Sequence, residues 1–110
     1  MIILFGRSKL HKIINDDKLL RRKYGALAST IRSRLDDLKA AETLSVIAKL
    51  PHHKCHELKG DREGCLAITL REPYRLVFEP ADEPSATKPD GGIDWDKVRS
   101  IRIIEIIDYH

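Results

Sequence analysis

Two segments of the sequence hold most of the side chains that could perform acid–base chemistry. One runs from His52 to Asp61 and reads HHKCHELKGD, and the other is the final triplet Asp108-Tyr109-His110. Cutting RNA without a metal needs a base for the ribose 2′-hydroxyl, an acid for the leaving 5′-oxygen and cations that stabilise the phosphorane. The residue types in these two segments are those that such a reaction requires.

A plainer interpretation is that these groups are ordinary surface residues. His56 and His110 would then be solvated histidines and Asp108 would only pair with a nearby arginine, and composition alone favours this view. If the last residues form a strand, alternation places Asp108 and His110 on one face and turns Tyr109 to the other. Periodicity does not choose between the two interpretations.

A zinc site is the main metal-dependent alternative. The possible ligands are His52, His53, Cys55, His56 and Cys65. No pair of them has the Cys-x-x-Cys spacing and most crowd into one run, so a metal-free site is favoured, and no metal or cofactor is expected. Cys65 more often serves as a small core residue, and His53 and Cys55 are read as residues at a strand edge.

Length, composition and charge limit the class of protein. A chain of 110 residues with 42% apolar and 34% charged residues fits one domain, residues 1–110, with a core inside a charged shell. Residues 1–60 hold 13 Lys and Arg against 6 Asp and Glu, whereas residues 61–110 hold 7 against 11. The basic half suits binding to a phosphate backbone, but a solvated helix face explains such an excess equally well.

The sequence predicts a protein of the cytoplasm. Its apolar runs are far shorter than the roughly 20 residues that span a bilayer, and Met1 to Phe5 is too short for the core of a signal peptide. In a reducing compartment Cys55 and Cys65 are expected to remain free thiols. No membrane partner is expected.

The first half of the chain predicts one strand followed by helices. Met1 to Phe5 suits a buried strand, Ser8 caps a short helix, and Thr43 caps another that ends before Pro51. The main helix is predicted from apolar residues at spacings of 4, 3, 4, 4 and 3, namely Leu20, Tyr24, Leu27, Ile31, Leu35 and Leu38. Gly25 is expected to bend or break this helix. Its other side is cationic, with Arg21, Arg22, Lys23, Arg32, Arg34 and Lys39.

The second half predicts strands at Cys55 to Leu58, Cys65 to Leu70, Tyr74 to Glu79 and Ser100 to Tyr109. The short links between the first three of them suit hairpins. In the last strand apolar residues occupy both odd and even positions, so both faces of the strand are covered, which predicts an interior position in the sheet. Pro80 to Lys97 is predicted to be an acidic, flexible loop, with Trp95 as the residue that pins it to the body.

The segment His56-Glu57-Leu58-Lys59-Gly60-Asp61-Arg62-Glu63-Gly64 resembles the HigB family, the plasmid maintenance killer proteins within the RelE-like superfamily of toxins. The resemblance includes Cys65-Leu66-Ala67-Ile68, Tyr74-Arg75-Leu76-Val77-Phe78 and the final Asp108-Tyr109-His110. It covers most of the chain from Leu20 onward. Two features depart from the family: Cys65-Leu66 stands where aromatic residues are common, and the Pro80 to Lys97 loop is longer than the usual turn.

The resemblance implies a RelE-like α+β fold, in which an N-terminal strand and helices pack on one face of a twisted, mainly antiparallel sheet. It also implies an mRNA endonuclease that acts in the ribosomal A site. His56 matches the family's catalytic histidine, and the residues that match its catalytic C-terminal cluster are Asp108, Tyr109 and His110. We expect His56 to come from a neighbouring strand and to complete an acid–base pair. The cations expected to hold RNA phosphates are Lys54, Lys59 and Arg75.

The partners that the resemblance implies are a HigA-type antitoxin with a helix-turn-helix domain, the ribosome and mRNA. Operator DNA is expected to be bound only through the complex with the antitoxin. The alternative is a non-catalytic module that uses the same fold to bind RNA or a protein, with the catalytic-looking residues inert.

Overall fold

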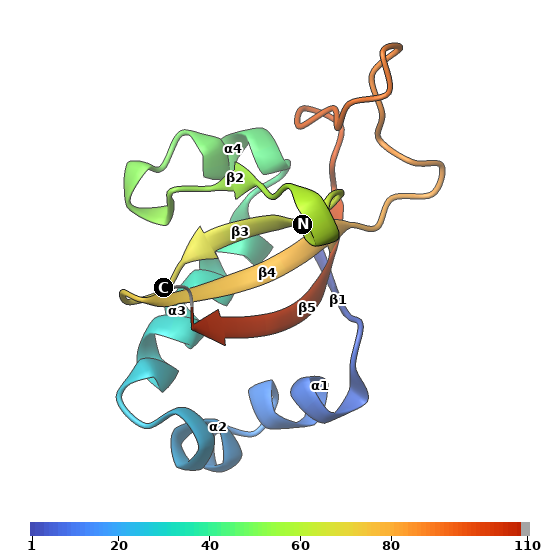
Figure 1. Cartoon of the computed structure of the whole chain (residues 1–110). Coiled ribbons are helices and arrows are strands. Elements are labelled where there is room, and N and C mark those ends of the chain that lie inside the picture. Colours follow the sequence, from blue (N-terminus) through green and yellow to red (C-terminus); the bar gives the residue numbers. More distant parts are fainter. Residues whose placement is uncertain (109–110) are drawn as a thin grey trace.

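The computed structural model of the chain, shown in Figure 1, describes residues 1–108. In chain order its elements are β1 (Ile2–Phe5), α1 (Ser8–Ile14), α2 (Asp17–Tyr24), α3 (Leu27–Ala40), α4 (Leu44–Ala48), the short helix η1 (Pro51–His53), β2 (His56–Glu57), the short helix η2 (Gly60–Arg62), β3 (Leu66–Thr69), β4 (Tyr74–Pro80) and β5 (Ser100–Asp108). Every strand and helix expected from the sequence is present, and the α+β class is confirmed. Two details differ: β1 is an edge strand with Ile2 and Leu4 62% and 41% exposed, so it is not a buried strand, and Arg7 rather than Ser8 is the N-cap residue of α1.

The strands form one five-stranded sheet in the order β1-β5-β4-β3-β2. β1 runs parallel to β5, and all other neighbouring pairs are antiparallel. β5 lies between β1 and β4, which confirms the interior position predicted for it. The register between β4 and β5 shifts at Val77 and Phe78, and such a bulge increases the local twist of the sheet.

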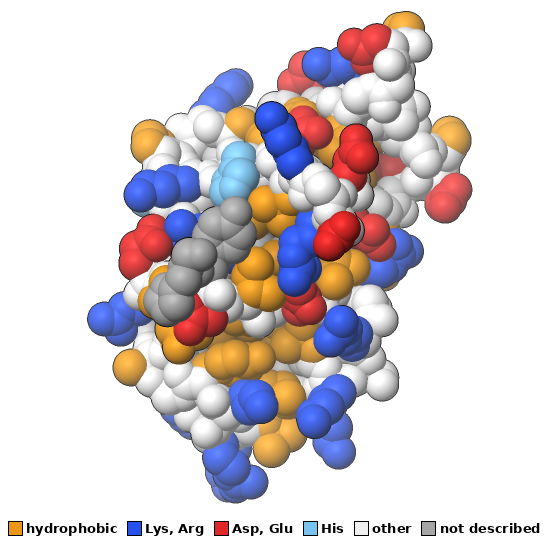
Figure 2. Space-filling view, viewed as in Figure 1, with side chains coloured by type: hydrophobic (Ala, Val, Ile, Leu, Met, Phe, Trp, Pro, Cys, Tyr) orange, Lys and Arg blue, Asp and Glu red, His pale blue; other side chains and the backbone are white. Residues whose placement is uncertain are grey.

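Helices cover one face of this sheet, and α3 crosses behind it in Figure 1. The fully buried strand side chains on that face are Leu66, Ile68, Leu76, Phe78, Ile101 and Ile103. The helices contribute Ile14, Leu20, Ile31, Leu38, Leu44 and Ile47. Burying a side chain of this size stabilises the fold by about 1.5–3 kcal/mol. The opposite face, which we call the front face, is turned toward the viewer in Figures 1 and 2.

The apolar stripe predicted from Leu20 to Leu38 is divided between two helices. Gly25 lies between them with φ 56° and ψ −128°, a conformation that a residue with a Cβ rarely adopts, so the break expected at this glycine is confirmed. The Asp16 side chain caps α2 by accepting hydrogen bonds from the backbone of Lys18 and Leu19 at 3.0 and 3.3 Å. Within residues 1–108, no helix is long and apolar enough to cross a membrane.

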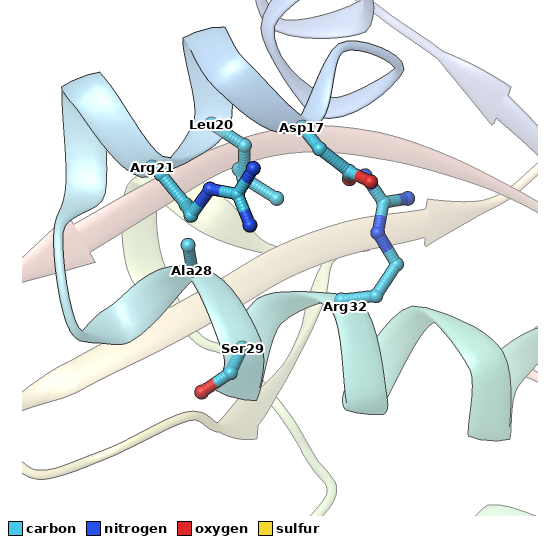
Figure 3. Close-up of a pocket in the computed structure, with 6 residues that line it drawn as sticks. All are labelled: Asp17, Leu20, Arg21, Ala28, Ser29 and Arg32. Atoms are coloured by element: carbon cyan, nitrogen blue, oxygen red, sulfur yellow. The ribbon is translucent and has the colours of Figure 1, made fainter.

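Two arginines of the predicted cationic side make contacts inside the fold. Arg32 donates to the Ile14 carbonyl and lies 2.9 Å from Oδ1 of Asp17, and Figure 3 shows Arg32 reaching toward Asp17 across the hollow between α2 and α3. Nε of Arg34 donates to the Thr69 carbonyl at 3.0 Å. These side chains join α3 to α1, α2 and β3, so they are more than a solvated helix face.

The segment of residues 81–99 connects β4 to β5. Its outer part closes on itself through a bridge between Thr87 and Ile93. Its inner part contacts the body, because Nε1 of Trp95 donates to Oε2 of Glu57 at 3.0 Å and the Trp95 carbonyl accepts from the Ser45 backbone at 3.2 Å. Trp95 therefore joins this segment to β2 and α4, as the sequence predicted.

Candidate active site

The centre of the front face is a row of residues that are paired across four strands. His56 pairs with Ala67, Ala67 with Val77, and Val77 with Glu105. Partners in a sheet share a face, and this row alternates with the core row of Leu66 and Phe78. Figure 2 shows apolar side chains in the middle of this face and Lys and Arg side chains around it. His56 is the imidazole at the β2 end of the row.

His56 is exposed, and its ring has a defined orientation. Nδ1 lies 2.9 Å from the carbonyl oxygen of Lys54. Because a carbonyl oxygen can only accept, Nδ1 carries the proton when the ring is neutral, and Nε2 then has the lone pair. In this tautomer His56 can take a proton through Nε2, as a general base must.

Two of the three predicted phosphate-binding cations lie close to His56. Glu72 joins them, with Oε1 4.0 Å from Nζ of Lys54 and Oε2 3.1 Å from Nη1 of Arg75. The Lys54 side chain is 67% exposed, whereas that of Arg75 is only 15% exposed. Lys59 is exposed but lies beyond the other end of β2, immediately before η2. The structure therefore brings Lys54 and Arg75 together and leaves Lys59 apart.

A further charged cluster lies at the β5 end of the row, and sequence reasoning did not find it. Glu105 forms an ion pair with Arg62 of η2 and another with Arg7, whose Nη2 is 3.5 Å from Oε2. The Glu105 side chain is only 21% exposed. Arg62 belongs to the segment that resembles the HigB family, but its approach to Glu105 depends on the order of the strands, which the sequence does not reveal.

The prediction that His56 lies on a strand next to the C-terminal strand is wrong. β3 and β4 lie between β2 and β5, so three strand spacings of about 4.8 Å separate the two backbones by about 14 Å. Asp108 pairs with Tyr74 at the end of β5, and alternation from Glu105 assigns it to the face opposite His56. Tyr109 and His110, the other two residues of the predicted catalytic cluster, lie outside the described residues.

Known proteins with similar sequences and folds are bacterial toxins. No protein-family model matches the chain. It is 44% identical over 46 residues to "Endoribonuclease HigB" of Proteus vulgaris, and 27% identical over 82 residues to "Toxin HigB-1" of Vibrio cholerae. The solved "YoeB/ParE toxin from Agrobacterium tumefaciens" superposes with a TM-score of 0.56 at 14% identity, over 100% of both chains. The chain is thus similar to HigB toxins in sequence and to a YoeB/ParE toxin in fold.

The sequence matches differ in the part of the chain that they cover. The match to the Proteus protein includes 40% of this chain and half the length of that relative. The match to the Vibrio protein includes 74% of this chain and 86% of that relative. The structural match at 14% identity shows the fold, and the fold inferred from the HigB resemblance is confirmed.

His53 faces a carboxylate of α3, and not the cysteines or His56 that the sequence offered as zinc ligands. His53, which we had read as an edge residue, is fully buried, and its Nε2 lies 3.0 Å from Oδ2 of Asp37 on α3. Burial lowers the pKa of His53, the nearby His52 and Arg34 lower it further, and Asp37 acts in the opposite direction. The balance of these effects lowers the pKa of His53 and favours its neutral form.

Proposed function

We propose that this protein is an endoribonuclease that cleaves mRNA on the ribosome, as the toxin of a type II toxin–antitoxin pair in the cytoplasm. The observation that carries the proposal is the exposed His56 ring, with Nδ1 held by the Lys54 carbonyl and with Lys54 and Arg75 close by. A base beside cations on an accessible sheet face is the arrangement that attack by a ribose 2′-hydroxyl requires. The endoribonuclease name of the Proteus relative supports the same chemistry.

The proposed reaction is metal-free. His56 exchanges a proton with the RNA on the front face. The C-terminal cluster of Asp108, Tyr109 and His110 is assigned to the reaction by the family resemblance alone, since β3 and β4 separate β2 from β5. A bound RNA would lie over the front face beside His56, with Ala67 and Val77 buried beneath the surface. The cations assigned to the phosphates are Lys54, Lys59 and Arg75.

The proposed partners follow from the toxin family. A HigA-type antitoxin would inhibit the toxin, and operator DNA would be bound only through their complex. The front face is the surface that an inhibitor of cleavage needs to cover, because His56 lies on it.

Induction of the toxin without an antitoxin tests the proposal. Growth should stop, and mapping of mRNA 5′ ends should show new cuts inside translated reading frames. His56→Ala should reduce cleavage by about 10²-fold or more, which is typical for the loss of a general acid or base. His11→Ala is the matched control, because His11 is also exposed but stacks on Phe5 with ring centroids 4.5 Å apart.

The second candidate function is a non-catalytic module of the same fold that binds RNA or a protein. The small exposure of Arg75, 15%, and its partner Glu72 favour this view, since they limit contact with a phosphate. Growth arrest with intact transcripts, unchanged by His56→Ala, would support the module and reject the nuclease.

A further inference from the structure

We propose that Asp37, His52 and His53 bind a divalent transition-metal ion, Zn²⁺ in the first place, at the junction of α3 and η1. The site is separate from the acid–base residues of the front face. Its function would be to fix η1, the short helix that leads into Lys54 and His56.

The three side chains already converge. Each offers one ligand atom, and these atoms all lie within 4.8 Å of one another. Nε2 of His53 is 3.0 Å from Oδ2 of Asp37, and the rings of His52 and His53 have centroids 4.2 Å apart with planes inclined by 58°. With bonds of about 2.0–2.2 Å, ligand atoms around tetrahedral zinc lie about 3.4 Å apart. A movement of about 1.5 Å by the exposed His52 side chain therefore completes the site.

His53 supplies an independent reason to expect a ligand. Its side chain is 0% exposed, and among the described residues Nδ1 has no hydrogen-bond partner. Nε2 faces the Asp37 carboxylate at 3.0 Å, in a geometry too poor for a good hydrogen bond. A buried nitrogen without a good partner destabilises a fold, and a metal ion between Nε2 and Asp37 would satisfy Nε2. The imidazole, the second imidazole and the carboxylate are all ligand types that zinc prefers.

The charges and ligand types around the site determine which cations it can bind. Asp37 contributes one negative charge, and the guanidinium of Arg34, one helical turn away, opposes a cation. Nε of Arg34 is held by the Thr69 carbonyl at 3.0 Å, on β3. With three protein ligands, water completes the coordination. The hard cations Ca²⁺ and Mg²⁺ prefer oxygen ligands, so two imidazoles select against them.

The test is calorimetric titration of the full, tag-free toxin with ZnCl₂, together with Co²⁺ absorption spectra, which report tetrahedral coordination by imidazole. We expect one ion per chain and a higher melting temperature in its presence. Asp37→Asn and His52→Gln should each weaken binding by about tenfold or more, since even an indirect supporting residue contributes 10- to 100-fold in metal sites. Circular dichroism verifies that both variants are folded, and the buried His53 is left unchanged.

Matched controls are available on the same elements. Asp36→Asn removes the neighbouring exposed carboxylate of α3, and His11→Gln removes an exposed histidine far from η1 in the sequence. Both should bind Zn²⁺ as the unchanged toxin does. Failure of the unchanged toxin to bind one ion, or equal affinity in Asp37→Asn and Asp36→Asn, would overturn the proposal.

Discussion

Oε2 of Glu72 lies 3.1 Å from Nη1 of Arg75, so a cation expected to hold RNA already has an anionic partner. The other oxygen of the same carboxylate is 4.0 Å from Nζ of Lys54. One carboxylate thus lies between two cations, as a phosphate would. An RNA phosphate must compete with Glu72 for both of them.

Glu72→Gln should therefore increase the affinity for RNA. The ion pair is partly exposed, and such pairs contribute about 0.2–1 kcal/mol, so we expect about a 1.5- to 5-fold tighter complex at low salt. The gain should decrease at high salt because screening weakens every charge involved. Fluorescence anisotropy with a 2′-O-methyl RNA oligonucleotide, which cannot be cleaved through its 2′-oxygen, measures the binding.

Glu83→Gln is the control for the change of net charge, since Glu83 is exposed and belongs to the segment between β4 and β5. It should alter affinity less than Glu72→Gln does. A weaker complex after Glu72→Gln would mean that Glu72 orients Arg75 rather than competes for it.

Arg34→Ala should destabilise the fold. Its Nε hydrogen bond to the Thr69 carbonyl is partly buried and joins α3 to β3, and loss of one partner of such a bond costs about 1–3 kcal/mol of unfolding free energy. Urea denaturation at two salt concentrations measures this loss, which should change little with salt. Arg22→Ala, an exposed arginine of α2, should stay within about 0.5 kcal/mol of the unchanged toxin. If Arg34→Ala left stability unchanged and weakened RNA binding in a salt-dependent way, Arg34 would belong to a solvated cationic face, as the sequence suggested.

Local patterns predicted the elements of the fold well. The stripe from Leu20 to Leu38 predicted the face that α2 and α3 bury, and Gly25 predicted where they separate. Apolar residues on both parities predicted that β5 is interior. The strand order was not predictable in this way, because pairing of β1 with β5 depends on contacts between the two ends of the chain.

The site was less predictable for the same reason. The sequence identified His56 and Lys54 as chemically suitable, but not that Glu72 lies between Lys54 and Arg75. The pairing of His53 with Asp37 joins η1 to α3, and alternation in a short segment could not indicate that His53 is buried. The roles of Asp108, Tyr109 and His110 stay predictions.

Trp95→Ala should release the segment of residues 81–99 from the body. Trp95 packs against the core and donates a hydrogen bond to Glu57, so its loss removes the main contact with β2. Limited proteolysis with an enzyme that cuts before aspartate should cleave the unchanged toxin at Asp90, in the exposed outer part. In the variant, cuts at Asp94 and Asp96 should follow.

Trp95→Phe separates the ring from its hydrogen bond. It retains an aromatic ring against the core and removes the Nε1 donor with part of the apolar surface, so its cleavage pattern should be closer to that of the unchanged protein than to that of Trp95→Ala. The anchoring role of Trp95 would be rejected if Trp95→Ala gave no cuts beyond Asp90.

The thiol of Cys55 should make the stability of the toxin depend on alkaline pH. Burial raises the pKa of Cys55 from 9.0 to about 12, and Glu57 acts in the same direction. The folded state thus keeps the proton to higher pH than the unfolded state does. The resulting contribution to stability is present below pH 9 and is lost progressively between pH 9 and 12.

Urea denaturation at pH 8 and pH 10, in EDTA so that bound metal does not contribute, measures this effect against Cys55→Ser. Ionisation of the unfolded thiol between pH 8 and pH 10 should lower the unfolding free energy by about 1.4 kcal/mol. The serine variant has no group at this position that titrates in the range, so its loss between the two pH values should be smaller by that amount. Cys65, whose pKa burial also raises, is present in both proteins and cancels in the comparison. Equal losses in the two proteins would mean that the Cys55 thiol ionises in the folded toxin as easily as in the unfolded chain.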